Sequence, residues 1–190
     1  MANTNNIVRI IRTTKTIERK TKNKEGSVII LTGTPGTGKD TIAKFLAKQG
    51  YIWIPLNDVV NLLKIWYKKE RGVKVVNLSK LKRAIDVIVQ DARKSNSKII
   101  LEGHLACEVP IRTDLCIVLR TETRILRRRL RARGWPRWKI DENIECEMID
   151  YCTQQAEKNL EGPIYEIDTS GPKTKTIKAV SAILRLFTEN

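Results

Sequence analysis

The residues best suited to chemistry begin with a glycine-rich loop that ends in a lysine. Residues 27–41 read SVIILTGTPGTGKDT, an apolar run that breaks into glycines and reaches Lys39. This pattern is typical of the phosphate-binding loop of nucleotide triphosphatases, because glycine backbone folds closely around phosphate oxygens with its N–H groups pointing inward. Lys39, expected to be partly solvated, adds a positive charge for the β- and γ-phosphates at a helix N-terminus. The predicted nucleotide-binding residues here are Gly33, Gly36, Thr37, Gly38, Lys39, Asp40 and Thr41.

A second apolar run ends in a carboxylate, two residues before the only histidine of the chain. Residues 98–104 read KIILEGH, so Glu102 ends a strand-like segment and His104 lies in the turn that follows. A carboxylate at a strand end beside a phosphate loop often holds Mg²⁺, directly or through water. We therefore expect Glu102 and Asp40 on the metal side. The near-neutral pKa of histidine would let His104 accept or donate a proton, and a structural histidine is the equal alternative.

The most basic stretch lies between residues 120 and 139. Arg129 and Arg133 are four residues apart and share one helix face, and planar guanidinium groups suit phosphate contacts. The Gly-Trp-Pro segment that follows predicts a mobile lid over residues 131–140 that closes on a triphosphate. A solvated face is the expectation for Arg124, Arg128 and Arg131. RNA contact is a third interpretation, because Trp135 and Trp138 are interleaved with the arginines.

Strand-like apolar runs alternate with longer helical patterns from residue 27 onward. We expect strands over 27–32, 51–54, 98–102, 114–119 and 164–167, and helices over 39–49, 58–70, 78–94, 121–132, 140–160 and 174–188. This alternation predicts an α/β three-layer fold with a five-stranded parallel sheet and helices on both faces. Right-handed crossovers would then bring the functional loops to the carboxyl edge of the sheet.

The overall charge indicates an anionic partner. The 190 residues include 36 Lys and Arg against 21 Asp and Glu, a net charge of +15, whereas a mononucleotide site needs only a few cations. The surplus indicates RNA or another acidic surface, with a solvated basic face as the alternative. Residues 1–26 are polar and basic, so we expect a mobile arm there and a single domain over 27–190.

The cysteines and the hydropathy pattern narrow the class of protein. The four cysteines form no CxxC pair, so a Cys/His metal site is not expected and reduced thiols of a cytosolic protein are the simplest account. No apolar run reaches the roughly 20 residues that span a bilayer. We therefore expect a cytoplasmic protein without a membrane partner.

Several separated motifs resemble known kinases. The loop GTPGTGK followed by Asp40 and Thr41 resembles that of nucleoside monophosphate kinases, and LRRRLRARGW (126–135) is similar to the lid entry of adenylate kinases. More narrowly, EGHL (102–105), RGWPRWKIDENIECEMID (133–150) and YEIDTSG (165–171) resemble the adenylate kinase-like NTPases that act in small ribosomal subunit maturation. The resemblance covers residues 27–188 and leaves out the N-terminal arm.

The resemblance implies roles for individual residues. Arg129 would lie along the adenine, Arg133 would reach the phosphates from the lid, and the 168–173 loop with Pro172 would pass beside the base. Residues 57–80 would form the monophosphate-binding flap, with Asn57 and Asp58 on the acceptor side. The implied catalytic residues are Lys39, Glu102, His104, Arg129 and Arg133.

The resemblance also implies an activity. We expect a Mg²⁺-dependent adenylate kinase or ATPase that transfers the γ-phosphoryl group of ATP to a nucleoside monophosphate such as AMP, or to water. A platform protein of the small ribosomal subunit and pre-ribosomal RNA are the implied partners. Residues 103–108 (GHLACE) lack the arginine found after this strand in ordinary adenylate kinases. The alternative is therefore an RNA- or ribosome-binding assembly factor that uses nucleotide as a switch and turns over slowly.

Overall fold

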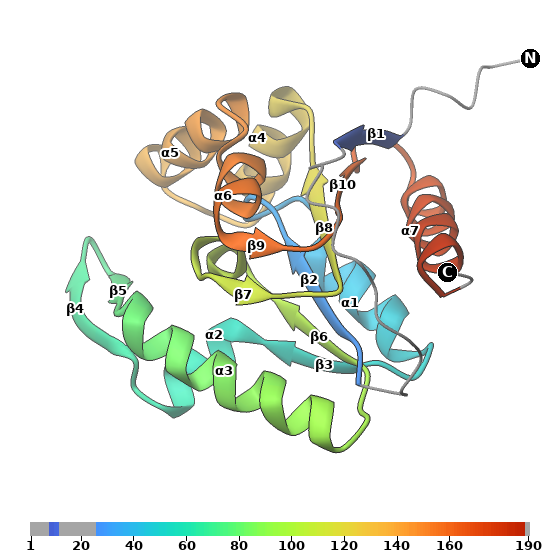
Figure 1. Ribbon diagram of the computed structural model, residues 1–190. Helices are drawn as coiled ribbons and strands as arrows, with labels where there is room; N and C mark the ends of the chain where they lie inside the picture. Colours follow the sequence, from blue (N-terminus) through green and yellow to red (C-terminus); the bar gives the residue numbers. More distant parts are fainter. Residues whose placement is uncertain (1–7, 12–25, 189–190) are drawn as a thin grey trace, which may run out of the picture.

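The central sheet contains five parallel strands and one antiparallel edge strand (Figure 1). The computed structural model describes residues 8–11 and 26–188. The order across the sheet is β1-β10-β8-β2-β6-β3. These strands are β1 (Val8–Ile11), β2 (Val28–Thr32), β3 (Ile52–Pro55), β6 (Ile99–Glu102), β8 (Leu115–Arg120) and β10 (Ile164–Asp168). The predicted five-stranded parallel sheet is confirmed.

Strand β1 adds a sixth strand from the region that the sequence assigns to a mobile arm. It pairs antiparallel with β10, with Val8 opposite Ile167. Of the predicted arm, residues 1–7 and 12–25 lie outside the described residues. The sheet is therefore mixed, with its only described antiparallel pairing at the β10 edge.

Helices cover both faces of the sheet because its strands are apolar on both sides. In β2 every residue is buried: Ile29 and Leu31 face one core, and Val28 and Ile30 face the other. The first core contains α1 (Lys39–Ala47) and α7 (Lys173–Thr188), and the second contains α2 (Leu56–Leu62), α3 (Leu78–Lys94) and α6 (Tyr151–Asn159). A short 3-10 helix, η2 (His104–Glu108), leads from β6 toward the pair β7 (Ile111–Arg112) and β9 (Leu160–Glu161).

Helices α4 (Thr123–Ala132) and α5 (Arg137–Met148) form a helical hairpin that follows the carboxyl end of β8 (Figure 1). Leu126 and Leu130 of α4 pack against Ile140 and Ile144 of α5, with Trp135 of the connecting turn beside them. The hairpin has its own small core. The segment predicted as a lid, residues 131–140, therefore belongs to one packed unit.

The predicted helix over 58–70 is wrong beyond residue 62. Helix α2 ends there, and β4 (Trp66–Glu70) pairs with β5 (Val73–Val76) in an antiparallel hairpin. Arg71 and Gly72 both have positive φ, 47° and 79°, as a tight two-residue turn requires. The apolar spacing of residues 58–70 predicts a helix, but the β-branched and aromatic residues on either side of Arg71-Gly72 favour strands.

The predicted helix over 140–160 is two helices. Asp150 adopts a left-handed conformation with φ 55° between α5 and α6. This conformation is costly for a residue other than glycine and ends a helix. Asp150 is held by an ion pair with Arg120, so the break depends on a partner 30 residues away.

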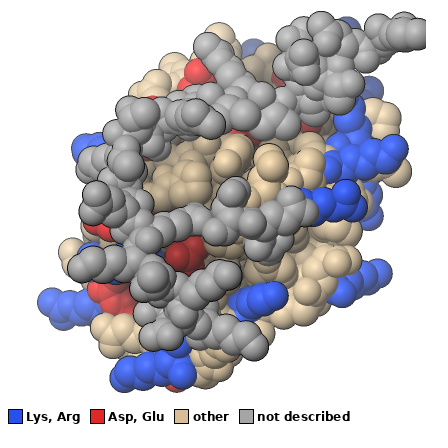
Figure 2. Space-filling model, turned by 45° about the vertical axis from the view of Figure 1, so that its right-hand side comes forward, with Lys and Arg blue, Asp and Glu red and all other residues tan. Residues whose placement is uncertain are grey.

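Positive side chains are not confined to the edge that carries the phosphate loop. The face shown in Figure 2 has Lys and Arg side chains at several separate places, on its left, right and lower sides, and Asp and Glu side chains are visible on the same face. Positive side chains on this face are therefore spread over separate places, and a specific anion site has to be argued from local geometry.

Candidate nucleotide site

The glycine-rich loop joins β2 to α1, as the sequence predicts, and Lys39 is more enclosed than expected. Its side chain is 7 % exposed, so the expectation of a partly solvated lysine is wrong. The ammonium group donates hydrogen bonds to the carbonyl oxygens of Gly33 at 2.8 Å and Thr34 at 3.2 Å. Burial lowers the pKa of Lys39, while the nearby carboxylates of Glu102 and Asp40 oppose that shift. The lysine is thus a poorly hydrated charge that is hydrogen-bonded to carbonyl oxygens of the loop.

The loop glycines allow close packing as well as an unusual backbone. Gly36 has φ +97°, and a Cβ there would lie 2.8 Å from Cδ1 of Leu126 and 2.9 Å from Cδ2 of Leu130. At Gly33, with φ +136°, a Cβ would lie 2.3 Å from the carbonyl oxygen of Leu119. Gly33 lies against β8, whereas Gly36 lies against α4. The loop is therefore held directly by the two elements that carry the basic stretch.

One cavity gathers most of the predicted catalytic residues. It measures about 890 Å³ and lies between the phosphate loop, the carboxyl end of β6, α2, β5 and α5. The predicted residues that line it are Gly36, Gly38, Lys39, Asp40, Asn57, Glu102, His104 and Arg133. Asp58 is exposed on the first turn of α2 and is not among the lining residues. We call this space the acceptor cavity.

The predicted flap and lid regions meet across the acceptor cavity. Arg71, at the turn of the β4–β5 hairpin, lies 5.4 Å from the ring centre of Trp138 and 3.8 Å from a carboxylate oxygen of Glu142. Both partners belong to α5. The hairpin that replaces the predicted helix is therefore the part of the 57–80 segment that reaches the lid.

Two carboxylates face the phosphate loop. Glu102 is 8 % exposed, and burial raises its pKa; Lys39 opposes this shift and the neighbouring Asp40 adds to it. Two carboxylates in one small region repel each other, and a divalent cation would relieve that repulsion. No group of three or more metal-ligating residues occurs within 8–11 and 26–188. This donor set fits Mg²⁺, which usually takes one or two carboxylates together with phosphate and water oxygens.

His104 titrates differently from the sequence expectation. Burial, with the charges of Lys39 and Lys139, lowers its pKa from 6.5 to about 4. Packing therefore shifts the near-neutral intrinsic pKa on which the sequence expectation rests, and the imidazole is neutral at physiological pH. A neutral ring can still accept a hydrogen bond or a proton from an attacking group, but it cannot serve as a standing imidazolium.

A second cavity lies on the other side of the loop and contains Arg129. It measures about 470 Å³ and is lined by Gly36, Thr37, Gly38, Thr41, Ile42, Arg129, Ala132, Arg133, Thr169, Gly171, Lys173 and Thr176. Arg129 donates to the carbonyl oxygen of Thr169 at 2.6 Å and to that of Gly36 at 3.4 Å. Pro172 is exposed between two of the lining residues but does not line the cavity. We call this space the donor cavity.

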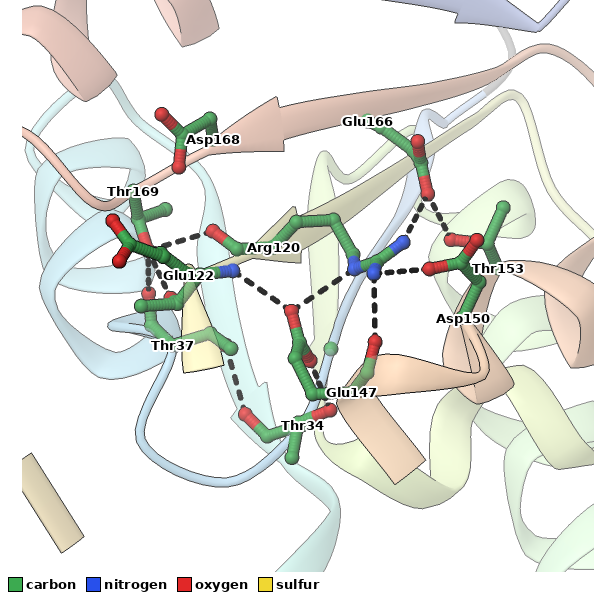
Figure 3. Close-up of polar contacts among 12 residues, drawn as sticks. Thr34, Thr37, Arg120, Glu122, Glu147, Asp150, Thr153, Glu166, Asp168 and Thr169 are labelled. Carbon is green, nitrogen blue, oxygen red and sulfur yellow. Dashed lines mark hydrogen bonds and ion pairs between the residues drawn. The ribbon is translucent and has the colours of Figure 1, made fainter. Parts of the chain in front are cut away.

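The structure adds a buried ion-pair network that the sequence interpretation missed (Figure 3). Glu147 is 3 % exposed and accepts hydrogen bonds from Nε of Arg120 at 3.0 Å, from the backbone N–H of Thr121 at 2.8 Å and from the hydroxyl of Thr34. Arg120 also pairs with Glu166 at 2.9 Å and with Asp150. Burial disfavours the charge of Arg120, but these carboxylates outweigh it and raise its pKa. The network fastens the phosphate loop to the α5–α6 junction.

Thr169 connects the loop to the end of β10. Its hydroxyl donates to the carbonyl oxygen of Thr37 at 2.8 Å and lies 2.6 Å from the hydroxyl of Thr121. The sequence interpretation placed this residue in the loop beside the base but gave it no role. The only available signal was its position directly after a strand at the functional edge.

Comparisons with known proteins agree with this architecture. A family described as "AAA domain" matches residues 29–150. A protein of Thermococcus gammatolerans named "Putative adenylate kinase" is 33 % identical over 163 residues, which cover 84 % of this chain and 85 % of that protein. A protein of Pyrococcus abyssi with the same name is 37 % identical over 151 residues, 79 % of each chain. The chain belongs to the P-loop, nucleoside monophosphate kinase-like family that contains these archaeal proteins.

Solved structures confirm the fold class. A gluconokinase from Sinorhizobium meliloti 1021 superposes with a TM-score of 0.55 at 16 % identity, covering 88 % of this chain and 97 % of that one. Deoxyadenosine kinase from M. mycoides gives a TM-score of 0.54 at 16 % identity, with 83 % and 98 % covered. The shared fold is that of P-loop kinases. Within 8–11 and 26–188, no helix has the length and hydropathy needed to cross a membrane.

Proposed function

We propose that this chain is a Mg²⁺-dependent nucleotide kinase that transfers the γ-phosphoryl group of ATP to a nucleoside monophosphate, AMP in the first instance, or to water. The observation that carries the proposal is the arrangement of the two cavities. Gly36, Gly38 and Arg133 line both the donor and the acceptor cavity. A phosphoryl group passed between two substrates has to travel through such a shared boundary, and these are residues of the phosphate loop and the lid.

The cationic side chains at this boundary would stabilise the charge of the transferred group. Lys39, on the acceptor side of the loop, would bind the β- and γ-phosphates, and Arg133 would reach them from the end of α4. Arg129 would lie beside the nucleotide in the donor cavity, where it already binds the loop and Thr169. Mg²⁺, when bound beside Asp40 and Glu102, would neutralise phosphate charge.

His104 would act on the attacking group. It lines the acceptor cavity together with Glu102, and its lowered pKa keeps the ring neutral. A neutral imidazole can accept a hydrogen bond from an attacking water, or donate its ring N–H to an oxygen of an attacking phosphate, and so orient either one. The acceptor cavity, at about 890 Å³, has room for a second substrate and not only for water. Its walls extend beyond the phosphate loop, because Asn57, Lys74 and Trp135 also line it.

The decisive experiment measures AMP-dependent formation of ADP beside AMP-independent release of phosphate, in the same samples. Kinase action predicts that ADP forms in proportion to added AMP, and that phosphate release without AMP is much slower. The variants Lys39→Met and Glu102→Gln should suppress both reactions, whereas Asn57→Ala should suppress mainly the AMP-dependent one. Wild-type protein that cleaves ATP at one rate with or without AMP would leave ATPase as the activity. Protein that binds ATP but cleaves none would favour the switch alternative.

We also infer a cytoplasmic role in assembly of the small ribosomal subunit, with a platform ribosomal protein and pre-ribosomal RNA as partners. The motif resemblance and the net charge of +15 support this proposal. The network around Glu147 would let nucleotide binding affect a surface at the α5–α6 junction, because the network joins Thr34 of the phosphate loop to that junction. Measuring affinity for a purified platform protein with and without ATP would test it; equal affinities would argue against nucleotide control.

A further inference from the structure

We propose that the outer face of the α4–α5 hairpin is a separate binding site for single-stranded RNA. A third open space, of about 400 Å³, lies there and is lined by Arg127, Arg131, Trp135, Arg137 and Ile140. Three guanidinium groups and an indole around one hollow have the chemistry that binds phosphodiester backbone and an unstacked base. This site, which we call the arginine hollow, shares only Trp135 with the acceptor cavity and no residue with the donor cavity.

The charges of the arginine hollow are incompletely neutralised. Asp141 pairs with Arg127 and lies 3.6 Å from Arg137. One carboxylate therefore serves two arginines. Arg131 is exposed and has no ion pair with any other residue in 8–11 or 26–188. Arg137 has a side chain that is 94 % exposed, so its charge is available to solvent and to a ligand.

The arginines continue along α4 beyond the hollow. Arg124, Arg127, Arg128 and Arg131 occupy positions i, i+3, i+4 and i+7, so they follow one side of the helix. Arg124 has one exposed ion pair, at 3.4 Å to Glu122. A single nucleotide would need only a compact group of cations, whereas a row of them along a helix matches the repeated phosphates of a polynucleotide. The row therefore favours RNA over a free nucleotide.

Trp135 gives the hollow a stacking surface. Its ring packs against the small core of α4 and α5, and the ammonium group of Lys139 lies 4.1 Å from the ring centre. The tryptophan is therefore held in place by its neighbours, and a base that stacks on the ring surface beneath Lys139 has to displace that ammonium group. A base stacks on such a fixed ring only when it is not already stacked in a duplex, so the site favours single strands.

The test measures fluorescence anisotropy of a short fluorescein-labelled oligouridine without nucleotide, which keeps it independent of the kinase proposal. The double variant Arg131→Gln/Arg137→Gln removes two charges from the hollow, and Lys158→Gln/Lys178→Gln removes two exposed charges from α6 and α7. We expect the first pair to weaken binding about tenfold or more and the control pair less than twofold. The slope of log K against log salt should fall by about 1.4, since each single-strand phosphate contact contributes about 0.7.

Stacking is tested with Trp135→Leu, which keeps an apolar side chain against the helical core. We expect this variant to weaken oligouridine binding about fivefold while its melting curve stays cooperative. If Trp135→Leu does not fold, stacking is measured in the wild type as the quenching of tryptophan fluorescence by added oligouridine. The Trp135→Phe variant should show less of this quenching.

Four outcomes would overturn the proposal. They are no oligouridine binding by the wild type, equal losses in the hollow and control pairs, equal affinity for duplex RNA, and displacement of the oligouridine by ATP. Equal losses would identify a general effect of net charge, which the separate basic places in Figure 2 make a necessary comparison. Displacement by ATP would identify the ligand as a small polyphosphate. None of these results depends on whether the chain transfers phosphate.

Discussion

Replacing Glu147 by alanine should destabilise the fold and loosen the phosphate loop together. The carboxylate is 3 % exposed and takes hydrogen bonds from Arg120, Thr121 and Thr34, so three segments lose a shared partner. Breaking a buried ion pair by removing one partner costs about 3–5 kcal/mol, and leaving a buried N–H without an acceptor adds to this. Arg120 keeps Glu166 and Asp150 and is 21 % exposed, which lowers the cost. We therefore expect a loss of about 3 kcal/mol.

Urea unfolding at neutral pH without nucleotide measures this loss. For a chain of this length, 3 kcal/mol corresponds to a melting temperature lower by about 6–12 °C. Glu145→Ala is the matched control, because Glu145 is exposed on the same helix and should change stability by less than about 0.5 kcal/mol. ATP affinity should also fall in Glu147→Ala, since the Thr34 hydroxyl loses its acceptor. Equal unfolding curves for the two variants would refute the reasoning.

Three further predictions concern Lys39 and Gly36 of the phosphate loop and His104, which follows β6. Lys39→Met should abolish ATP cleavage without lowering the urea midpoint, because burial already penalises the lysine charge, as its lowered pKa indicates; cleavage at the wild-type rate would exclude the proposed role. The pKa of His104 is lowered from 6.5 to about 4 in the folded protein. Between pH 6.5 and pH 4 the unfolded chain therefore binds a proton that the folded protein does not, and the free energy of unfolding decreases as the pH falls. Between pH 7 and pH 4 the wild type should therefore lose about 3 kcal/mol more than His104→Asn, and parallel unfolding profiles would contradict this. Gly36→Ala should cost about 2–4 kcal/mol, from its positive φ and from Cβ contacts under 3 Å with Leu126 and Leu130, and a variant with wild-type stability would show that α4 moves aside.

Local patterns in the sequence were sufficient for the parallel sheet and for the phosphate loop. The run VIILT is apolar on both faces and could only be a central strand, and the glycine spacing before Lys39 determines a loop with its own backbone geometry. The spacing of Arg129 and Arg133 likewise predicted one face, and both residues line the donor cavity. These features depend on residues that are neighbours in the chain, so their physics can be worked out without the fold.

The remaining features depend on contacts between distant segments. Arg120 was interpreted as one cation of a basic stretch, but its partners Glu147, Asp150 and Glu166 lie 27 to 46 residues further along the chain. The burial that lowers the pKa of His104 likewise comes from packing. Desolvation and ion pairing depend on which segments the topology brings together. The sequence by itself determined which groups could bind phosphate, and only the tertiary structure decided which of them lose water, which are paired and which remain free to bind a ligand.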